Sequence, residues 1–357
     1  MFQIIQKLLE TQVEPFNMNK VIIIAEAGVN HNGDINIAKK LIDAAAYAEV
    51  DYVKFQTFKA DTIVSPSAKK ADYQSKNTGD NTQSQHEMLK NLELSEQDHD
   101  ELITYCELKN VQFLSSAFDV EGIGYLESLG LNLFKIPSGE ITNFPYLRAI
   151  AKTNKPVILS TGMASMDDIH TAITVLQDFG ANKENLTILH CNTEYPTPMK
   201  DVNLHAMNNI KDEFGVAVGY SDHTLGIEVP IAAVALGAGV IEKHFTLDNT
   251  LPGPDHKASL EPDALKQMVL AIRNIEKAIS GDGVKQPSAS EQKNISIARK
   301  SIHLCHNLAE GHIITESDLI PLRPGDGMSP MEWTNVIGKT VTRDLMRFEK
   351  LNWSDIS

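Results

Sequence analysis

Short apolar runs alternate with amphipathic stretches from residue 21 to about residue 280. We expect the apolar runs to form buried strands, because each is short and bounded by turn residues. They cover residues 21–26, 51–56, 111–118, 132–138, 155–162, 186–192, 215–223 and 238–245. The stretches between them place apolar residues three and four apart, which predicts helices, most clearly at residues 35–49, 95–109, 120–130 and 166–180. Eight such units in succession favour a (β/α)8 TIM barrel over an open sheet.

The composition changes after the eighth unit. Residues 281–296 are rich in Gly, Ser, Pro, Lys and Gln, which is typical of a linker. The residues that follow have short apolar pieces and many turns, and a domain that small buries little surface alone. We therefore predict an N-terminal extension at 1–17, a barrel at 18–282, a linker at 283–297 and a small domain at 298–357.

Residues 59–88 form an unusually long polar connection between the second strand and the next long helix. A connection of that length inside a compact domain is usually functional. We therefore expect an active-site loop there.

The charge of the chain limits its partners. Its 357 residues include 47 acidic and 32 basic side chains, which gives a formal net charge of −15. A protein that follows the phosphates of a nucleic acid needs a basic face, so we expect no nucleic-acid partner. An anionic small molecule remains compatible with this charge, because only the local field at its site matters.

Other features indicate a cytoplasmic protein without a membrane partner. The longest apolar stretch, residues 229–241, is too short to span a bilayer, and the N-terminal segment lacks the continuous apolar run of a secretory signal. The cysteines, Cys106, Cys191 and Cys305, are scattered and odd in number. A disulfide framework is therefore not expected.

Charged side chains lie at the ends of several predicted strands, where a TIM barrel carries its active site. Glu26 ends the first strand, and an acid that finishes an apolar run is paired or functional because an isolated buried charge is costly. Lys54 and Gln56 share one face of the second strand, since side chains two apart point the same way. Lys135 occupies a similar position in the fourth strand. Two lysines at strand ends indicate an anionic ligand.

Small hydroxyl side chains accompany these charges. Ser116 lies in the third strand, Ser138 follows the fourth together with Glu140, and Ser160 ends the fifth. Hydroxyl groups near helix N-termini can donate to phosphate oxygens, although Ser160 could equally cap the next helix. We count Ser138 among the candidate substrate-binding residues.

Three histidines, His190, His223 and His244, lie near the ends of the sixth, seventh and eighth strands. Histidines from neighbouring strands can converge, and imidazoles with open coordination positions suit a divalent metal that binds substrate oxygens. The chain has no HExxH or CxxC spacing, which disfavours a closed zinc site.

A series of motifs appears in order along the chain: AEAGVNHNGD, VKFQTFKAD, FKIPSGE, STGM, HCNTEYPTP, GYSDHT, EKHFTLD, GPDH and RPGDGMSPMEW. From about Lys20 to the end, this series closely resembles the sialic acid synthase (N-acetylneuraminate synthase) family. The resemblance implies a TIM barrel followed by a small β-clip domain of the antifreeze-like SAF type. It also implies a domain-swapped homodimer in which each small domain caps the partner's barrel.

The same resemblance implies a reaction. Phosphoenolpyruvate, N-acetylmannosamine and water would give N-acetylneuraminate and phosphate by C–O cleavage. A divalent metal would assist, most often Mn²⁺, with Mg²⁺ or Co²⁺ as alternatives.

The family's functional residues are carried over position by position. The implied metal ligands are His223 and His244, and the implied acid/base candidates are Glu26 and Glu140. The implied phosphoenolpyruvate set is Lys54, Ser116, Lys135, Ser160 and Ser221, with Asn192 or Thr193 assisting. The implied acceptor set is Gln56, Tyr73, Tyr195, Asp255 and, from the partner's small domain, Arg323. By this comparison His190 has a structural role. Some members have the order Thr-Asn where this chain has Asn192 and Thr193, so the amide contact could come from either position.

Three other functions remain open at this level. A legionaminic or pseudaminic acid synthase would take a 2,4-diacetamido hexose as its acceptor, and the motifs do not reveal one extra acetamido group. A non-catalytic carbohydrate- or ice-binding protein would have no use for two lysines beside a metal pair. A metal-dependent aldolase acting on pyruvate would release no phosphate.

Overall fold

A computed structural model of the chain describes residues 20–78 and 84–357, apart from the side chains of Tyr73, Lys76 and Thr78. The predicted extension at residues 1–17 therefore lies outside the described residues. The chain divides into two compact units, Met1–Ser280 and Gly281–Ser357, and each has its own hydrophobic core. No helix of the described residues is long and apolar enough to cross a membrane.

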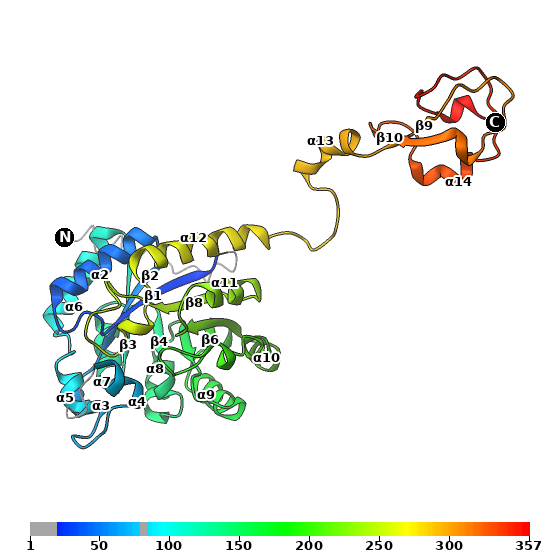
Figure 1. Cartoon of the computed structure of the whole chain (residues 1–357). Helices are drawn as coiled ribbons and strands as arrows, with labels where there is room; N and C mark the ends of the chain where they lie inside the picture. The colour runs from blue at the N-terminus through cyan, green and yellow to red at the C-terminus, as the bar shows by residue number, and fades with distance from the viewer. Residues whose placement is uncertain (1–19, 79–83) are drawn as a thin grey trace, which may run out of the picture. The chain divides into compact units, whose positions relative to one another are not determined.

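The first unit is built on eight parallel strands, ringed by helices in Figure 1. They are β1 (Ile22–Gly28), β2 (Tyr52–Thr57), β3 (Gln112–Ala117), β4 (Phe134–Ile136), β5 (Val157–Ser160), β6 (Leu186–Cys191), β7 (Ala217–Asp222) and β8 (Val240–His244). Their order in the sheet is β3-β2-β1-β8-β7-β6-β5-β4, and β3 also contacts β4. The sheet therefore nearly closes on itself, which confirms the predicted TIM barrel.

A long helix follows each strand or its connection, as the periodicity predicted. The helices are α2 (Ile35–Ala48), α6 (Glu96–Lys109), α7 (Val120–Ser128), α8 (Phe144–Lys152), α9 (Met166–Asp178), α10 (His205–Phe214), α11 (Glu228–Ala235) and α12 (Pro262–Ala278). Local sequence sets their ends. Ser95 begins α6 with a capping box to Asp98, and Ser165 begins α9 with one to Asp168. Each box satisfies backbone N–H groups that the first turn leaves unpaired.

The predicted loop at 59–88 is partly helical. It contains α3 (Ala60–Ile63), α4 (Asp72–Thr78) and α5 (Gln85–Lys90). Ser84 caps α5 by a capping box, and Met88 packs with Phe58 in a small apolar cluster. Composition alone missed these helices because each is too short to show a period. The Asn77 side chain donates to the Pro254 carbonyl at 2.7 Å, which ties α4 to the loop after β8.

An ion-pair network joins the starts of β1 and β2 to α12. Arg273 Nη2 lies 2.7 Å from Asp51 Oδ2, and Arg273 Nη1 donates to the Val21 carbonyl at 2.7 Å. The Ile23 N–H donates to the same Asp51 oxygen. The network lies at the N-terminal end of the strands, opposite the end at which a TIM barrel carries its chemistry.

The second unit is small and largely irregular. β9 (Ser301–Leu304) and β10 (Leu319–Leu322) pair antiparallel, and α14 (Trp333–Val336) follows them. Its core contains Ile302, Leu304, Val336, Val341 and Leu351. The predicted linker, residues 283–297, includes most of α13 (Ala289–Ala298).

Candidate active site

The parallel register brings polar residues of neighbouring strands to one level of the barrel. Glu26 of β1 pairs with Lys54 of β2 on one side and with His244 of β8 on the other. Gln56 of β2 pairs with Ser116 of β3. Because paired residues of parallel strands share a face, these side chains point into the barrel together at its C-terminal end.

Two buried lysines and two buried glutamates form an ion-pair cluster at this end. Lys54 Nζ lies 2.6 Å from Glu26 Oε2 and 3.6 Å from Glu242 Oε2. It also donates to the Ser116 hydroxyl at 3.3 Å. Lys135 Nζ lies 3.2 Å from Glu242 Oε1. All four residues are at most 4% exposed, so each charge depends on the others to offset its desolvation.

Glu242 is the residue that the motif search missed. It lies between both lysines and also accepts a hydrogen bond from the Ser221 hydroxyl at 3.0 Å. The signal was present, because Glu242 is two residues before His244 and therefore shares its face of β8. The alternation rule that singled out Lys54 and Gln56 would have found it.

Charge and burial separate the two glutamates. Burial raises the pKa of Glu26, and although Lys54 opposes this, nearby Glu242 adds to the rise. Burial also acts to raise the pKa of Glu242, but Lys135 and Lys54 outweigh it and hold that pKa below its usual value. Glu242 is therefore the permanent counter-ion of the lysines, and Glu26 is the more readily protonated acid.

His223 and His244 converge beside this cluster. Their ring centroids lie 5.3 Å apart, and the Tyr195 ring lies 4.0 Å from that of His223. Burial lowers the pKa of His223 to about 4 and that of His244 well below its usual value, so both rings are neutral at neutral pH. The His223 Nδ1 contacts the Asn192 carbonyl. That contact places the proton on Nδ1 and leaves Nε2 with a free electron pair.

These residues fit a metal ion. The buried His244 Nδ1 has no hydrogen-bond partner, and Asp255 Oδ2 lies 3.9 Å from it. Neutral imidazole is the form that binds metals. In residues 20–78 and 84–357 no group of three or more His, Cys, Asp or Glu side chains is arranged to hold a metal ion. Two histidines alone would leave most coordination positions open for substrate, unlike the four protein ligands of a structural zinc ion.

His190 does not join the other two histidines. Its Nε2 contacts the Val202 carbonyl at 2.9 Å, and its ring packs against Tyr220. The expected convergence of three histidines is therefore wrong for this one. It pairs with Tyr220 in the β6–β7 register, whereas the next residue, Cys191, pairs with the inward-facing Ser221. His190 thus lies on the outer face of the barrel.

The ends of β5 and β6 supply small polar groups. The Ser160 hydroxyl is buried without a hydrogen-bond partner in the described structure. The Ser138 hydroxyl accepts a hydrogen bond from the Gly162 N–H at 2.9 Å and lies 3.3 Å from the Cys191 sulfur. A Cβ at Gly162 would lie 2.4 Å from Thr193 Cγ2, so only glycine fits. The backbone at Gly162 is thus packed tightly against the side chains of Thr193, Ser138 and Cys191.

The residues expected to bind the acceptor differ in where the structure places them. Gln56 Nε2 donates to Glu26 Oε1 at 3.2 Å, so Gln56 lies at the ion-pair cluster. Burial raises the pKa of Asp255 to about 7, and Glu26 adds to the rise. Tyr73 lies in α4, but its side chain is outside the described part of the chain.

Glu140 and Asn192 have local partners. Glu140 lies in the short 3-10 helix Ser138–Glu140, and Asn143 donates to its Oε2 at 2.6 Å. Burial raises the pKa of Glu140, an effect that Asn143 opposes. The Asn192 side chain accepts from the Glu194 N–H at 2.8 Å and so shapes the turn after β6.

Arg323 belongs to the second unit. It is exposed there, and its Nε donates to the Ala298 carbonyl at 2.9 Å.

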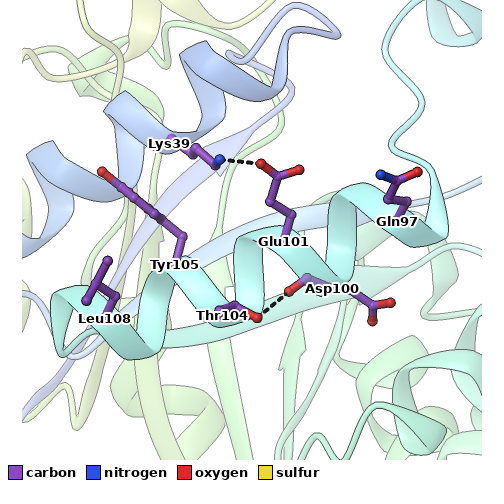
Figure 2. Close-up of a pocket in the computed structure, with 7 residues that line it drawn as sticks. All are labelled: Lys39, Gln97, Asp100, Glu101, Thr104, Tyr105 and Leu108. Carbon is purple, nitrogen blue, oxygen red and sulfur yellow. Dashed lines mark hydrogen bonds and ion pairs between the residues drawn. The ribbon is translucent and has the colours of Figure 1, made fainter.

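A surface hollow of about 420 Å³ lies elsewhere on the first unit. Figure 2 shows its lining, which comes from α6 apart from Lys39 of α2. Lys39 pairs with Glu101 across it. The hollow is open and lacks the buried charges at the strand ends, so we place the chemistry in the barrel and not here.

Comparison with known proteins identifies the family. The NeuB family profile matches residues 41–285, and the SAF domain profile matches residues 299–357. The chain belongs to the NeuB family. It is therefore a phosphoenolpyruvate-dependent nonulosonic acid synthase with a C-terminal SAF domain, and enzymes of the NeuB family depend on a metal.

Individual relatives of this NeuB-family enzyme match 78% or more of its length. The N,N'-diacetyllegionaminic acid synthase of Campylobacter jejuni subsp. jejuni is 55% identical over 92% of this chain and 97% of its own. The protein of the same name from Legionella pneumophila is 48% identical over 94% of each chain. The crystal structure of the N-acetylneuraminic acid synthetase of Leptospira borgpetersenii, in complex with citrate, is 36% identical, with a TM-score of 0.67. That match covers 78% of this chain and 91% of the Leptospira chain.

Proposed function

We propose that this enzyme condenses phosphoenolpyruvate with a 2,4-diacetamido hexose to give a legionaminic acid and phosphate. Sequence identity supports this acceptor. The two relatives named as diacetyllegionaminic acid synthases are 55% and 48% identical to this chain, whereas the N-acetylneuraminic acid synthetase is 36% identical. N-acetylmannosamine, the acceptor that the motifs first suggested, becomes the second candidate.

One observation carries the proposed binding of phosphoenolpyruvate. Lys54 and Lys135 are buried in one barrel and both lie near Glu242, and the unpaired Ser160 hydroxyl is buried at the end of β5, the strand beside that of Lys135. Lysines hold the phosphate and carboxylate groups as point charges, and hydroxyls add directional donors. With both glutamates ionised this cluster has no net charge, and protonation of Glu26 or a bound cation would make it positive for an anionic substrate.

The reaction needs a fixed approach and a proton carrier. C3 of phosphoenolpyruvate bonds to the aldehyde carbon of the open-chain sugar, and the aldehyde oxygen takes up a proton. Water then adds to C2 and gives up a proton, and the C2–O bond breaks so that phosphate leaves with the bridging oxygen. Glu26, whose pKa is raised by burial, is our first candidate for the proton transfers, and Glu140 is the second. Lys54 and Lys135 fix the geometry of approach.

His223 and His244 would hold the metal, with Asp255 and Tyr195 beside them. We propose Mn²⁺, which when bound would polarise the acceptor carbonyl as a Lewis acid. Gln56, Asn192, Thr193 and Tyr73 remain proposed substrate contacts.

We also propose that the enzyme is a cytoplasmic, domain-swapped homodimer. The second unit is small, and its exposed Arg323 is available to complete the barrel site of a partner subunit. Sedimentation of the full chain tests the dimer, which a monomer at micromolar concentration would contradict.

The acceptor is tested by phosphate release from phosphoenolpyruvate with Mn²⁺ present. We expect kcat/KM for the 2,4-diacetamido hexose to exceed that for N-acetylmannosamine by about 10²-fold or more. When the second amide of the sugar is missing, the buried polar groups that would bind it stay unpaired, which costs about 2–3 kcal/mol of transition-state binding. A chelator should abolish release with both sugars.

Other results assign other functions. Faster turnover of N-acetylmannosamine would make the enzyme a sialic acid synthase. Aldol product from pyruvate without phosphate would indicate an aldolase. If none of the acceptor sugars gave any phosphate release, the protein would be a binding protein and not an enzyme.

A further inference from the structure

A second buried ion pair lies behind the two candidate metal ligands. Lys243 Nζ lies 2.5 Å from Asp222 Oδ2, and both side chains are fully buried. Asp222 directly precedes His223, and Lys243 directly precedes His244. The two charged residues are partners in the β7–β8 register. One ion pair therefore links the residues that lead into both histidines.

The pair points away from the active site. Side chains alternate along a strand, so Asp222 and Lys243 occupy the outer face of the barrel while the histidines occupy the inner one. Their charges therefore neither contact substrate nor join the Lys54 and Lys135 cluster.

Lys243 also holds the chain beyond His223. Its Nζ donates to the Thr224 carbonyl as well as to Asp222. Asp222 in turn accepts from the Thr224 N–H and from the Thr224 hydroxyl, both at 3.0 Å. The residues on either side of His223 are thus tied to the residue before His244, and the backbone around one ligand is fixed relative to the other.

Stability alone is a poor explanation for this arrangement. A buried ion pair loses much of its Coulomb attraction to desolvation, and apolar residues of similar volume are often as stable. Orientation of the metal ligands is a better explanation, because residues that hold metal ligands in place commonly affect the affinity for the metal.

We propose that Asp222 and Lys243 are positioning residues that set the separation of His223 and His244 and thereby the affinity for the metal. This inference rests on the proposed metal site at those histidines.

The test measures Mn²⁺ binding to the full chain, with the electron paramagnetic resonance signal of free Mn²⁺ as the readout. The double variant Asp222→Asn with Lys243→Met removes both charges together and leaves none unpaired. We expect its Kd for Mn²⁺ to rise about 10- to 100-fold while circular dichroism stays that of the wild type. Thr224→Val, which removes one hydrogen bond to Asp222, should raise Kd by a few fold even if the double variant folds poorly.

Two controls separate the possible failures. Arg273→Met breaks the ion pair at the opposite end of the barrel and should lower stability without changing Kd. His223→Ala should abolish binding, and unchanged binding in it would overturn the metal site and this inference together. Loss in His223→Ala, but wild-type Kd in both the double variant and Thr224→Val, would overturn the positioning role alone.

Discussion

Glu26→Gln is expected to lower kcat on the order of 10²- to 10⁴-fold, because glutamine keeps the shape of the side chain but its amide cannot act as a proton donor or acceptor in acid–base catalysis. The fold should persist. Lys54 would still have Glu242 at 3.6 Å and the Ser116 hydroxyl at 3.3 Å, so its buried charge would keep partners. Initial rates of phosphate release at saturating substrates measure the effect, with circular dichroism to verify folding.

Glu101→Gln provides the matched control for Glu26. Glu101 is an exposed acid that lines the hollow in Figure 2 and pairs with Lys39, so the same substitution there should leave kcat unchanged. Wild-type turnover in Glu26→Gln would remove Glu26 from the proton transfers and leave Glu140 as the candidate.

Lys135→Met is expected to lower kcat/KM for phosphoenolpyruvate about 10²- to 10³-fold, or about 3–4 kcal/mol, since a buried lysine that binds an anion has no substitute. Methionine keeps most of the side-chain length. Glu242 would retain Ser221 at 3.0 Å and Lys54, so the barrel should still fold. The measurement is the dependence of phosphate release on phosphoenolpyruvate concentration at a fixed concentration of acceptor.

The matching control is Lys39→Met on the outer helix α2, which should show wild-type kinetics. A Lys135→Met enzyme with an unchanged response to phosphoenolpyruvate would place anion binding elsewhere. The KM for the acceptor sugar should change less than the KM for phosphoenolpyruvate, because Lys135 is proposed to bind phosphoenolpyruvate and not the sugar.

The barrel could be predicted from the sequence because its signals are local and repeated. Each strand is a short apolar run, and long helices such as α6 and α9 begin at serines with a matching acid three residues later. The segment at 59–88 was harder, because α3 and α5 are shorter than the window over which periodicity can be measured.

The alternation of side chains along a single strand was enough to predict part of the site. That rule found Lys54 and Gln56, and it would have found Glu242 if it had been applied to β8. It could not show that one carboxylate serves both lysines, because β4 and β8 meet only across the closed barrel. It also did not show that His190 faces outward, which follows from its register with Tyr220 of the neighbouring strand β7.

We propose that the barrel joins phosphoenolpyruvate to an acceptor sugar and releases phosphate by C–O cleavage. The decisive experiment uses phosphoenolpyruvate labelled with ¹⁸O in the bridging position, the 2,4-diacetamido hexose as acceptor, and ³¹P NMR of the products. We predict one phosphate for each sugar consumed, carrying the label, and no release without the sugar. Phosphate formed without acceptor, or label retained in the carbon product, would exclude this reaction.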